Sequence, residues 1–148
     1  MFPIKKQFQF LKALVLLLFI SATAIAQKET AEAHKLRWKE PAGIDDVKNP
    51  FAGVSAEADS GKIRYMKICS VCHGNSGKGD GVAAPGLTVK PADHTSTLVQ
   101  SATDGQLFWE VTNGHAPMPA YKTLLTEKQR WQLVCFIRTL KSKSAASK

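Results

Sequence analysis

Cysteine is scarce in this chain of 148 residues, which contains only Cys69, Cys72 and Cys135. Three is an odd number, which argues against a framework of disulfide bonds. A structural zinc site needs four ligands, and Cys135 stands alone, without a partner that would complete a second cysteine pair. The few cysteines therefore argue against both a disulfide-stapled scaffold and a zinc-binding module.

The sequence also lacks a hydrophobic run long enough to cross a membrane. Its apolar stretch, residues 13–26, contains 14 residues, whereas a spanning helix needs about 20. That stretch follows three lysines and ends in Ala24-Ile25-Ala26, the small residues that a signal peptidase requires. No cysteine follows it, so a lipid anchor is not indicated. We expect residues 1–26 to be a signal peptide cut before Gln27, with retention as an anchor as the alternative.

Acidic residues are fewer than basic ones, 12 against 20, so the net charge is +8. Removal of residues 1–26 would lower this charge to +5. No stretch interleaves basic and aromatic residues, so the sequence does not indicate nucleic-acid binding. The glycine-rich stretch 74–81 has Asp80 where a phosphate-binding loop needs lysine. The modest positive charge instead predicts a surface that steers toward an acidic protein partner.

The most informative stretch that is present is Cys69-Ser70-Val71-Cys72-His73. Two thiols three residues apart lie on one face of a helical turn, so both sulfurs can add to the two vinyl groups of one porphyrin. The adjacent His73 can then bind the iron. A dithiol site of the thioredoxin kind would need a βαβ pattern around the motif, and the sequence shows none. The motif therefore predicts covalent attachment of c-type haem.

Hydrophobic periodicity and capping residues predict helices and no convincing strand. The expected helices run from Ser60 into the haem motif, from Thr103 or Asp104 to about Thr112, and onward from a Thr126–Gln129 capping box. We therefore expect an all-α fold. Because the sequence has no internal repeat, we expect a single haem.

Four segments are expected along the chain. They are the signal peptide 1–26, an irregular N-terminal extension 27–58, a haem-binding domain 59–141 and a basic tail 142–148. A short helix is predicted from Thr30 to Trp38 within the extension. Trp38 and Phe51 are its expected anchors against the domain or a partner, and a disordered linker is the alternative.

A low-spin haem takes a second axial ligand, and electron carriers favour the methionine thioether because it stabilises Fe(II). Met118 lies between Pro117 and Pro119, which restrict the backbone and reduce the entropy cost of holding a weak ligand in place. We therefore predict Met118 as this ligand. Of the remaining candidates, Met66 is interpreted as a core residue. His115 is the runner-up ligand and is interpreted as a histidine of a surface loop. His34 and His94 are interpreted as ordinary polar residues.

From about Ser60 to Leu140 the chain resembles the class I cytochromes c, in particular the small exported bacterial proteins with one haem. The matching pieces are Gly61…Tyr65, Cys69-Ser70-Val71-Cys72-His73-Gly74, Gly79-Asp80-Gly81, Pro91-Ala92-Asp93, Asp104-Gly105-Gln106-Leu107-Phe108-Trp109, Gly114 with Met118-Pro119, and Arg130-Trp131…Ile137-Arg138-Thr139-Leu140. The resemblance implies a cytochrome c fold around one covalently bound haem. Its N- and C-terminal helices would cross at Gly61/Tyr65 and the Trp131–Phe136 region.

The resemblance also implies roles for individual residues. His73 and Met118 would be the axial ligands. The carbonyl of Pro85 would accept a hydrogen bond from His73 Nδ1 and so orient the ring. Trp109 or Tyr121 would reach a haem propionate.

These observations predict a periplasmic c-type cytochrome that passes single electrons between a redox protein donor and acceptor. It would have no small-molecule substrate and would not itself be an enzyme. The alternative is a haem c subunit of a larger membrane oxidoreductase, with residues 27–58 as an assembly arm. A peroxidase would need an open iron position, which Met118 argues against. Cys135 departs from the family pattern, and we interpret it as a buried small hydrophobic residue.

Overall fold

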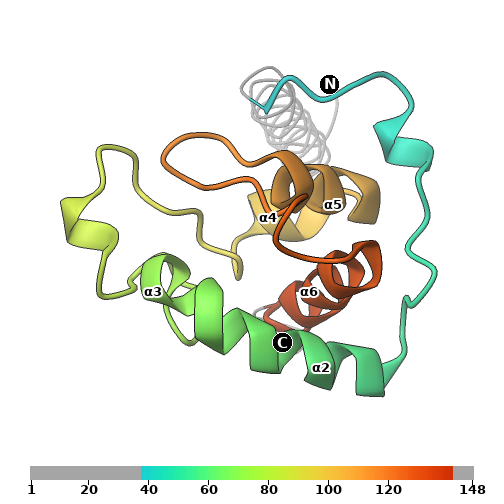
Figure 1. Ribbon diagram of the computed structural model, residues 1–148, viewed down its shortest axis with the longest axis horizontal. Helices are drawn as coiled ribbons and strands as arrows, with labels where there is room; N and C mark the ends of the chain where they lie inside the picture. Colours follow the sequence, from blue (N-terminus) through green and yellow to red (C-terminus); the bar gives the residue numbers. More distant parts are fainter. Residues whose placement is uncertain (1–37, 142–148) are drawn as a thin grey trace, which may run out of the picture. The chain divides into compact units, whose positions relative to one another are not determined.

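The computed structural model describes residues 38–141 as helices joined by loops, with no β-strand in that range (Figure 1). In chain order the elements are η1 (Ile44–Asp46), α2 (Ser55–Ile68), α3 (Ser70–His73), η2 (Ala84–Gly86), α4 (Thr97–Ser101), α5 (Asp104–Asn113) and α6 (Glu127–Thr139). The predicted all-α fold is confirmed. Predictions for the signal peptide, for His34 and for the tail 142–148 fall outside the described residues.

Helices α2 and α6 cross and pack directly on each other, as Figure 1 shows. The crossing point is Gly61, where an added Cβ would lie 1.9 Å from the carbonyl oxygen of Gln132 and 3.0 Å from Cβ of Phe136. One turn later Tyr65 is fully buried, and its ring centroid lies 4.9 Å from that of Phe136. The predicted crossing of the two helices is therefore confirmed.

Helix α6 supplies most of the core. Thr126 and Gln129 form the predicted capping box, in which each side chain bonds the other residue's backbone N–H. Its buried apolar side chains are Trp131, Leu133, Val134, Cys135, Phe136 and Ile137. Burial of one of the larger side chains in this set stabilises the fold by roughly 1.5–3 kcal/mol. Helix α6 is therefore buried over more of its surface than the single apolar face that is typical of a surface helix.

Helix α5 lies against α6 and is also capped as predicted. Thr103 and Gln106 form its capping box, and Gly114 follows its last residue, Asn113. The ring of Phe108 stacks on that of Trp131, with centroids 4.0 Å apart. These contacts fix α5, and with it the loop that follows, relative to α6.

Arg138 ties the end of α6 to the connection between α4 and α5. Its Nε donates to Asp104 Oδ1 at 2.6 Å, and one terminal nitrogen donates to the carbonyl of Ala102 at 2.5 Å. The other terminal nitrogen reaches the carbonyls of Val99 and Gln100. A planar guanidinium presents these donors in a fixed fork that lysine cannot reproduce.

One helix boundary differs from the sequence prediction, and one short helix is additional. Helix α2 begins at Ser55, so the predicted start at Ser60 is wrong by five residues; Val54 precedes it without a side-chain cap. Helix α4 was not predicted at all. It has five residues, capped by Ser96, and is too short to show a hydrophobic period.

Residues 38–54 belong to the same compact unit as the helices. An added Cβ on Gly105 would lie 2.0 Å from the carbonyl oxygen of Ile44, so this segment runs directly over the start of α5. Asn49 Nδ2 donates to Asp104 Oδ2 at 3.0 Å and to Cys135 Sγ at 3.4 Å. Phe51 packs against the core, as expected of an anchor. This part of the predicted extension therefore covers the domain.

Cys135 is buried, and its Sγ donates to the carbonyl of Phe51 at 3.4 Å. Burial raises the pKa of this thiol, although the hydrogen bond from Asn49 opposes the shift. The interpretation of Cys135 as a small buried residue is confirmed.

Within residues 38–141, no helix combines the length and apolar character that crossing a bilayer requires.

Candidate haem site

The two cysteines of the motif lie on one helical turn. Cys69 follows α2 and precedes α3, and its carbonyl accepts hydrogen bonds from the N–H groups of Cys72 at 3.1 Å and His73 at 2.9 Å. Both thiols are half-buried and free. The helical turn expected for the motif is therefore present, and it places both sulfurs on one face.

The glycine-rich loop after the motif caps this short helix. The carbonyls of Val71, Cys72 and His73 accept hydrogen bonds from Ala83 N–H at 2.9 Å, Gly81 N–H at 3.0 Å and Gly79 N–H at 2.8 Å. The last carbonyls of a helix have no partner within the helix itself. An added Cβ on Gly81 would lie 2.4 Å from the carbonyl oxygen of Val71, so only glycine permits this approach. The loop thus holds the haem-binding turn rigid, a role that the sequence did not reveal.

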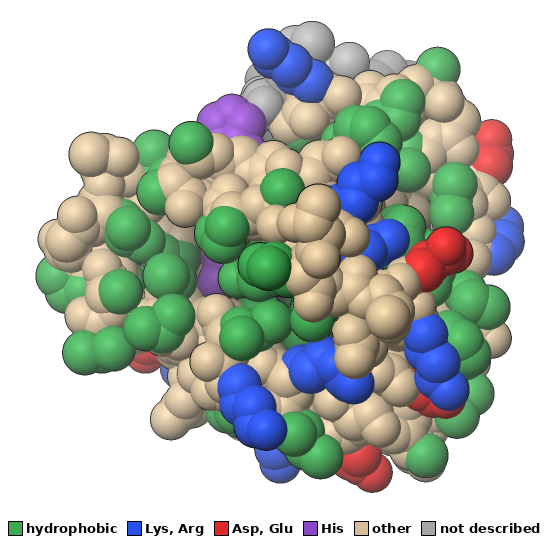
Figure 2. All heavy atoms as spheres, viewed as in Figure 1, with side chains coloured by type: hydrophobic (Ala, Val, Ile, Leu, Met, Phe, Trp, Pro, Cys, Tyr) green, Lys and Arg blue, Asp and Glu red, His purple; other side chains and the backbone are tan. Residues whose placement is uncertain are grey.

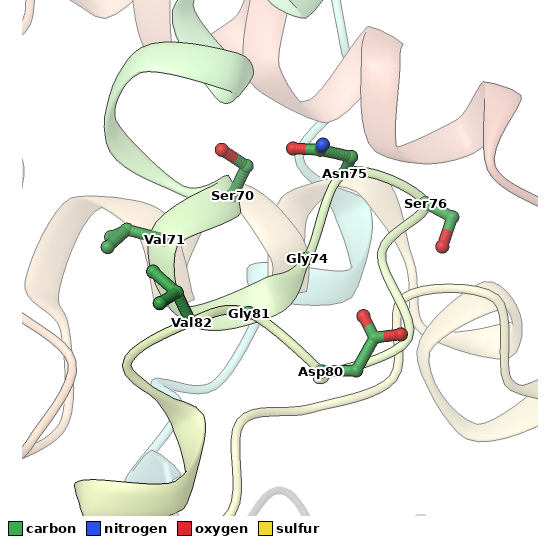
Figure 3. Close-up of a pocket in the computed structure, with 8 residues that line it drawn as sticks. All are labelled: Ser70, Val71, Gly74, Asn75, Ser76, Asp80, Gly81 and Val82. Atoms are coloured by element: carbon green, nitrogen blue, oxygen red, sulfur yellow. The ribbon is translucent and has the colours of Figure 1, made fainter.

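A shallow depression of about 530 Å³ lies between this turn and the loop (Figure 3). Its lining is mixed, from Ser70, Val71, Gly74, Asn75, Ser76, Asp80, Gly81 and Val82. Figure 3 shows Val71 and Val82 next to each other. Neither the cysteines nor His73 line the depression, so we do not assign it to the cofactor.

His73 is held as a neutral imidazole. It is buried, and its Nδ1 lies 3.0 Å from the carbonyl oxygen of Ala92. Because a carbonyl only accepts, Nδ1 carries the proton and Nε2 keeps its lone pair for a metal. Burial lowers the pKa of His73, although the hydrogen bond to Ala92 opposes the shift. The neutral imidazole is the form that binds iron.

The predicted hydrogen bond from His73 to Pro85 is wrong. Pro85 is exposed in η2, and Ala92, seven residues later, provides the carbonyl. The reason lies in the path of the loop: an added Cβ on Gly79 would lie 2.4 Å from the carbonyl oxygen of Pro91, so the segment around Pro91 and Ala92 passes beside the haem turn. The Pro91-Ala92-Asp93 motif is one of the pieces that match the family, but the sequence alone does not indicate that it orients His73.

Met118 lies in a tight loop built on the end of α5. Reciprocal backbone hydrogen bonds join His115 and Met118 at 3.0 and 2.9 Å. The loop returns to α5, where Tyr121 N–H donates to the carbonyl of Val111 at 3.2 Å. Gly114 has φ of 63°, and an added Cβ there would lie 2.5 Å from the carbonyl carbon of Pro119. Backbone contacts thus define the position of the loop.

The side chain of Met118 is half-buried and packs against the core, as does that of Met66. His115 is exposed, and its ring centroid lies 5.5 Å from that of the half-buried Trp38. The interpretation of Met66 as a core residue is therefore confirmed, and His115 lies on the surface as expected. Ligation of iron by Met118 stays a prediction.

Of the two aromatic residues expected near a propionate, Tyr121 lies close to the haem turn. It is buried, and its pKa rises to about 12 because of burial and then because of the neighbouring Cys69 and Cys72. Trp109 is half-buried on α5. A propionate contact by either residue stays a prediction.

The interpretation of His94 as an ordinary polar residue is wrong. His94 is buried, and its ring stacks on that of His73 with centroids 4.1 Å apart and planes 17° from parallel. Its Nδ1 lies 3.0 Å from the hydroxyl of Tyr65. Burial, and then His73, lower the pKa of His94 to about 3. The sequence contains one signal for this role, because His94 directly follows the Pro91-Ala92-Asp93 motif. His94 is far from His73 in the chain, so the sequence does not show that the two rings are in contact.

The donor set fits haem c. Two free thiols share one turn, and a neutral imidazole beside them has Nε2 available. Burial, and then Cys72, raise the pKa of Cys69 to about 12, so this thiol stays protonated before it reacts. Cys69 and Cys72 would hold the ring through thioether bonds, and His73 would bind the iron.

Comparisons with known proteins agree with this chemistry. The family model described as cytochrome c oxidase, cbb3-type, subunit III, matches residues 56–137, more than half of the chain. A solved structure with a similar fold is a chain of the reducing HAO-like protein complex of Kuenenia stuttgartiensis, with 27% sequence identity and a TM-score of 0.58. The alignment covers 65% of this chain and 50% of that one, so this chain spans about half of its structural neighbour. No curated protein sequence matches significantly.

The match, the fold and the Cys69–His73 turn agree on one assignment. The family's domain is a cytochrome c domain, which implies covalently bound haem c and a role in electron transfer. The chain therefore belongs to the family of cbb3-type cytochrome c oxidase subunit III and is a c-type cytochrome.

Proposed function

We propose that this protein is an exported carrier with one haem, which takes a single electron from one redox protein and passes it to another. The observation that carries the proposal is the fixed, neutral His73 imidazole beside two free thiols on one helical turn. The loop that contains Met118 is defined by backbone hydrogen bonds, which supports Met118 as the second ligand. Residues 1–26 support export to the periplasm, because they combine lysines, an apolar run and a small-residue cleavage site.

Each site residue has a distinct task in this proposal. Cys69 and Cys72 keep the cofactor on the chain, and the loop hydrogen bonds at Gly79 and Gly81 keep their turn from moving. His73 Nε2 and Met118 Sδ would bind the iron. Haem c bound there supplies an iron that cycles between the ferric and ferrous states. If both ligands stay bound, the protein rearranges little when the electron arrives or leaves.

The surface supports brief contacts with protein partners. Figure 2 shows hydrophobic side chains gathered over α3 and the following loop, and Lys and Arg side chains mainly over α2 and α6. Exposed Val71 and Val82, which are 44% and 86% accessible, lie next to the haem-binding turn. An apolar patch at the haem-binding turn, together with basic side chains over α2 and α6, suits transient docking to an acidic partner.

The substitution Met118→Leu tests the proposed ligand. Leucine has a similar volume but no sulfur, so the fold should persist while the iron loses its sixth ligand. We expect the ferric methionine–iron charge-transfer band to disappear completely, the ferrous protein to bind carbon monoxide, and the reduction potential to fall because the thioether favours Fe(II). Optical spectroscopy and redox titration of the purified protein measure these changes.

The matched control is Met66→Leu. Met66 packs against the core and has no proposed contact with iron, so this variant should keep the charge-transfer band and remain closed to carbon monoxide. Persistence of the band in Met118→Leu would show that Met118 is not the ligand.

A second candidate function is that of a haem c subunit within a larger oxidoreductase. Two observations favour it: the matching family is named for an oxidase subunit, and the structural neighbour comes from a protein complex. Size-exclusion chromatography of extracts made with and without mild detergent distinguishes the two. For a carrier we expect the haem-containing chain to elute without detergent at the size of one 16.1 kDa chain or slightly less. Recovery only in a stable, larger assembly would favour the subunit.

A further inference from the structure

The segment Ala92–His94 contacts the proposed iron ligand His73 in two different ways. The carbonyl of Ala92 accepts a hydrogen bond from Nδ1 of His73 at 3.0 Å. The ring of His94 instead covers one face of that imidazole, with centroids 4.1 Å apart and an interplanar angle of 17°. A hydrogen bond at one nitrogen restrains where the ring points. A flat neighbour on its face restrains rotation of the ring about the Cβ–Cγ bond.

We propose that His94 is a positioning residue that sets the rotational orientation of the His73 imidazole over the haem. The proposal rests on ligation of iron by His73, which belongs to the proposed function above. The orientation of an axial imidazole plane governs how its orbitals overlap with those of the iron. It therefore influences the electronic structure of the ferric state and the reduction potential.

Both backbone polar groups of His94 are hydrogen-bonded. Its backbone N–H donates to the carbonyl of Gly77 at 2.6 Å, and its carbonyl accepts from Gln100 Nε2 at 2.6 Å. Gln100 also donates to the carbonyl of Ile137 in α6. Gly77 has φ of 79°, and an added Cβ there would lie 3.2 Å from Cβ of His94, so the loop passes close to this residue. The backbone of His94 is therefore anchored independently of its ring.

The ring of His94 is oriented by Tyr65. The hydroxyl of Tyr65 lies 3.0 Å from His94 Nδ1, and the two ring centroids are 5.7 Å apart at 64°. Tyr65 is fully buried at the α2–α6 crossing, where its ring also contacts Phe136. Burial raises the pKa of Tyr65, so its hydroxyl keeps its proton and remains available for the hydrogen bond. A chain of contacts thus runs from the helix crossing through Tyr65 and His94 to His73.

Two substitutions at position 94 separate positioning from mere packing. His94→Leu removes the flat ring, whereas His94→Phe keeps a flat ring but cannot accept a hydrogen bond from Tyr65. Both variants leave the Tyr65 hydroxyl without its partner, so both should lose thermal stability. The readouts are the ferric electron paramagnetic resonance g-values and the proton NMR shifts of the haem methyl groups, which report the orientation of the axial imidazole, together with the reduction potential.

We expect His94→Leu to change the g-values, the order or spread of the methyl shifts and the potential, while His94→Phe stays close to the parent protein. Parent-like spectra in His94→Leu, or equal changes in both variants, would overturn the proposal. If His94→Leu does not accumulate, His94→Met also removes the flat ring and gives the same readout: altered methyl shifts support the proposal, and unaltered shifts overturn it.

Measurements on the parent protein separate this inference from the proposed function. A parent protein without covalent low-spin haem would overturn both. A different result is low-spin haem with a methionine–iron band in the parent protein and parent-like spectra in His94→Leu. That result would overturn only the role of His94.

Discussion

Replacing Cys69 and Cys72 together by alanine is expected to abolish covalent haem attachment. The two sulfurs share one helical turn that is capped by the following loop, and each would form one thioether bond to the porphyrin. Without them, His73 and Met118 could retain haem only through bonds to the iron, which break when the protein unfolds. We expect the haem stain of the protein on a denaturing gel to fall to background.

The matched control is Cys135→Ala, because Cys135 is buried on α6 and bonds Phe51 and Asn49 rather than the haem turn. This variant should keep its full haem stain. Each single variant, Cys69→Ala or Cys72→Ala, should retain at most one thioether, visible as a shifted ferrous absorption band. A haem stain that survives in the double variant would contradict the assignment of these residues.

Gly61→Ala is expected to destabilise the protein by about 2 kcal/mol, an overpacking cost of about 3 kcal/mol less about 1 kcal/mol gained in helix propensity. Alanine in the middle of a helix is favoured over glycine by up to about 1 kcal/mol. Overpacking in a close-packed interior costs about 1–3 kcal/mol. Here the added Cβ would lie 1.9 Å from the backbone oxygen of Gln132, which cannot rotate away as a side chain could. The steric cost therefore exceeds the gain in helix propensity, and α2 and α6 must separate.

Such a loss is a large share of the roughly 5–15 kcal/mol that stabilises a typical domain. It should lower the melting temperature by roughly 10 °C, and urea denaturation of the haem-loaded protein measures the free energy directly. Gly86→Ala is the control, because no atom lies within 4 Å of an added Cβ there. We expect this control to change stability by less than about 0.5 kcal/mol. Equal effects in the two variants would exclude a steric origin at the helix crossing.

The features predicted correctly from the sequence depend on residues close together in the chain. Thr126 with Gln129 forms the predicted capping box because the two lie three residues apart at a helix start, and Thr103, one of the two predicted N-caps of α5, caps that helix. The thiols of Cys69 and Cys72 share a face for the same geometric reason. The crossing at Gly61 was predicted through a family resemblance rather than from local pattern.

The errors at the haem site concern contacts between residues far apart in the chain. Ala92, and not Pro85, accepts the hydrogen bond from His73, 19 residues away. His94 reaches His73 and Tyr65 only because the glycine-rich loop turns back on itself. Residues 38–54 cover the domain as expected, but only the structure shows that they do so through a close approach at Gly105 of α5. Local composition contains no information on any of these approaches.

The sequence by itself determined which atoms can bind and hold a haem, because the spacing of thiols and imidazole and the capping of helices are local properties of the chain. Only the tertiary structure decided which carbonyl orients His73, which ring covers its face, and how the loops support the haem-binding turn. The physical reason is that these contacts follow from the path of long loops and the packing of helices. That path is set by the whole core rather than by neighbours in sequence.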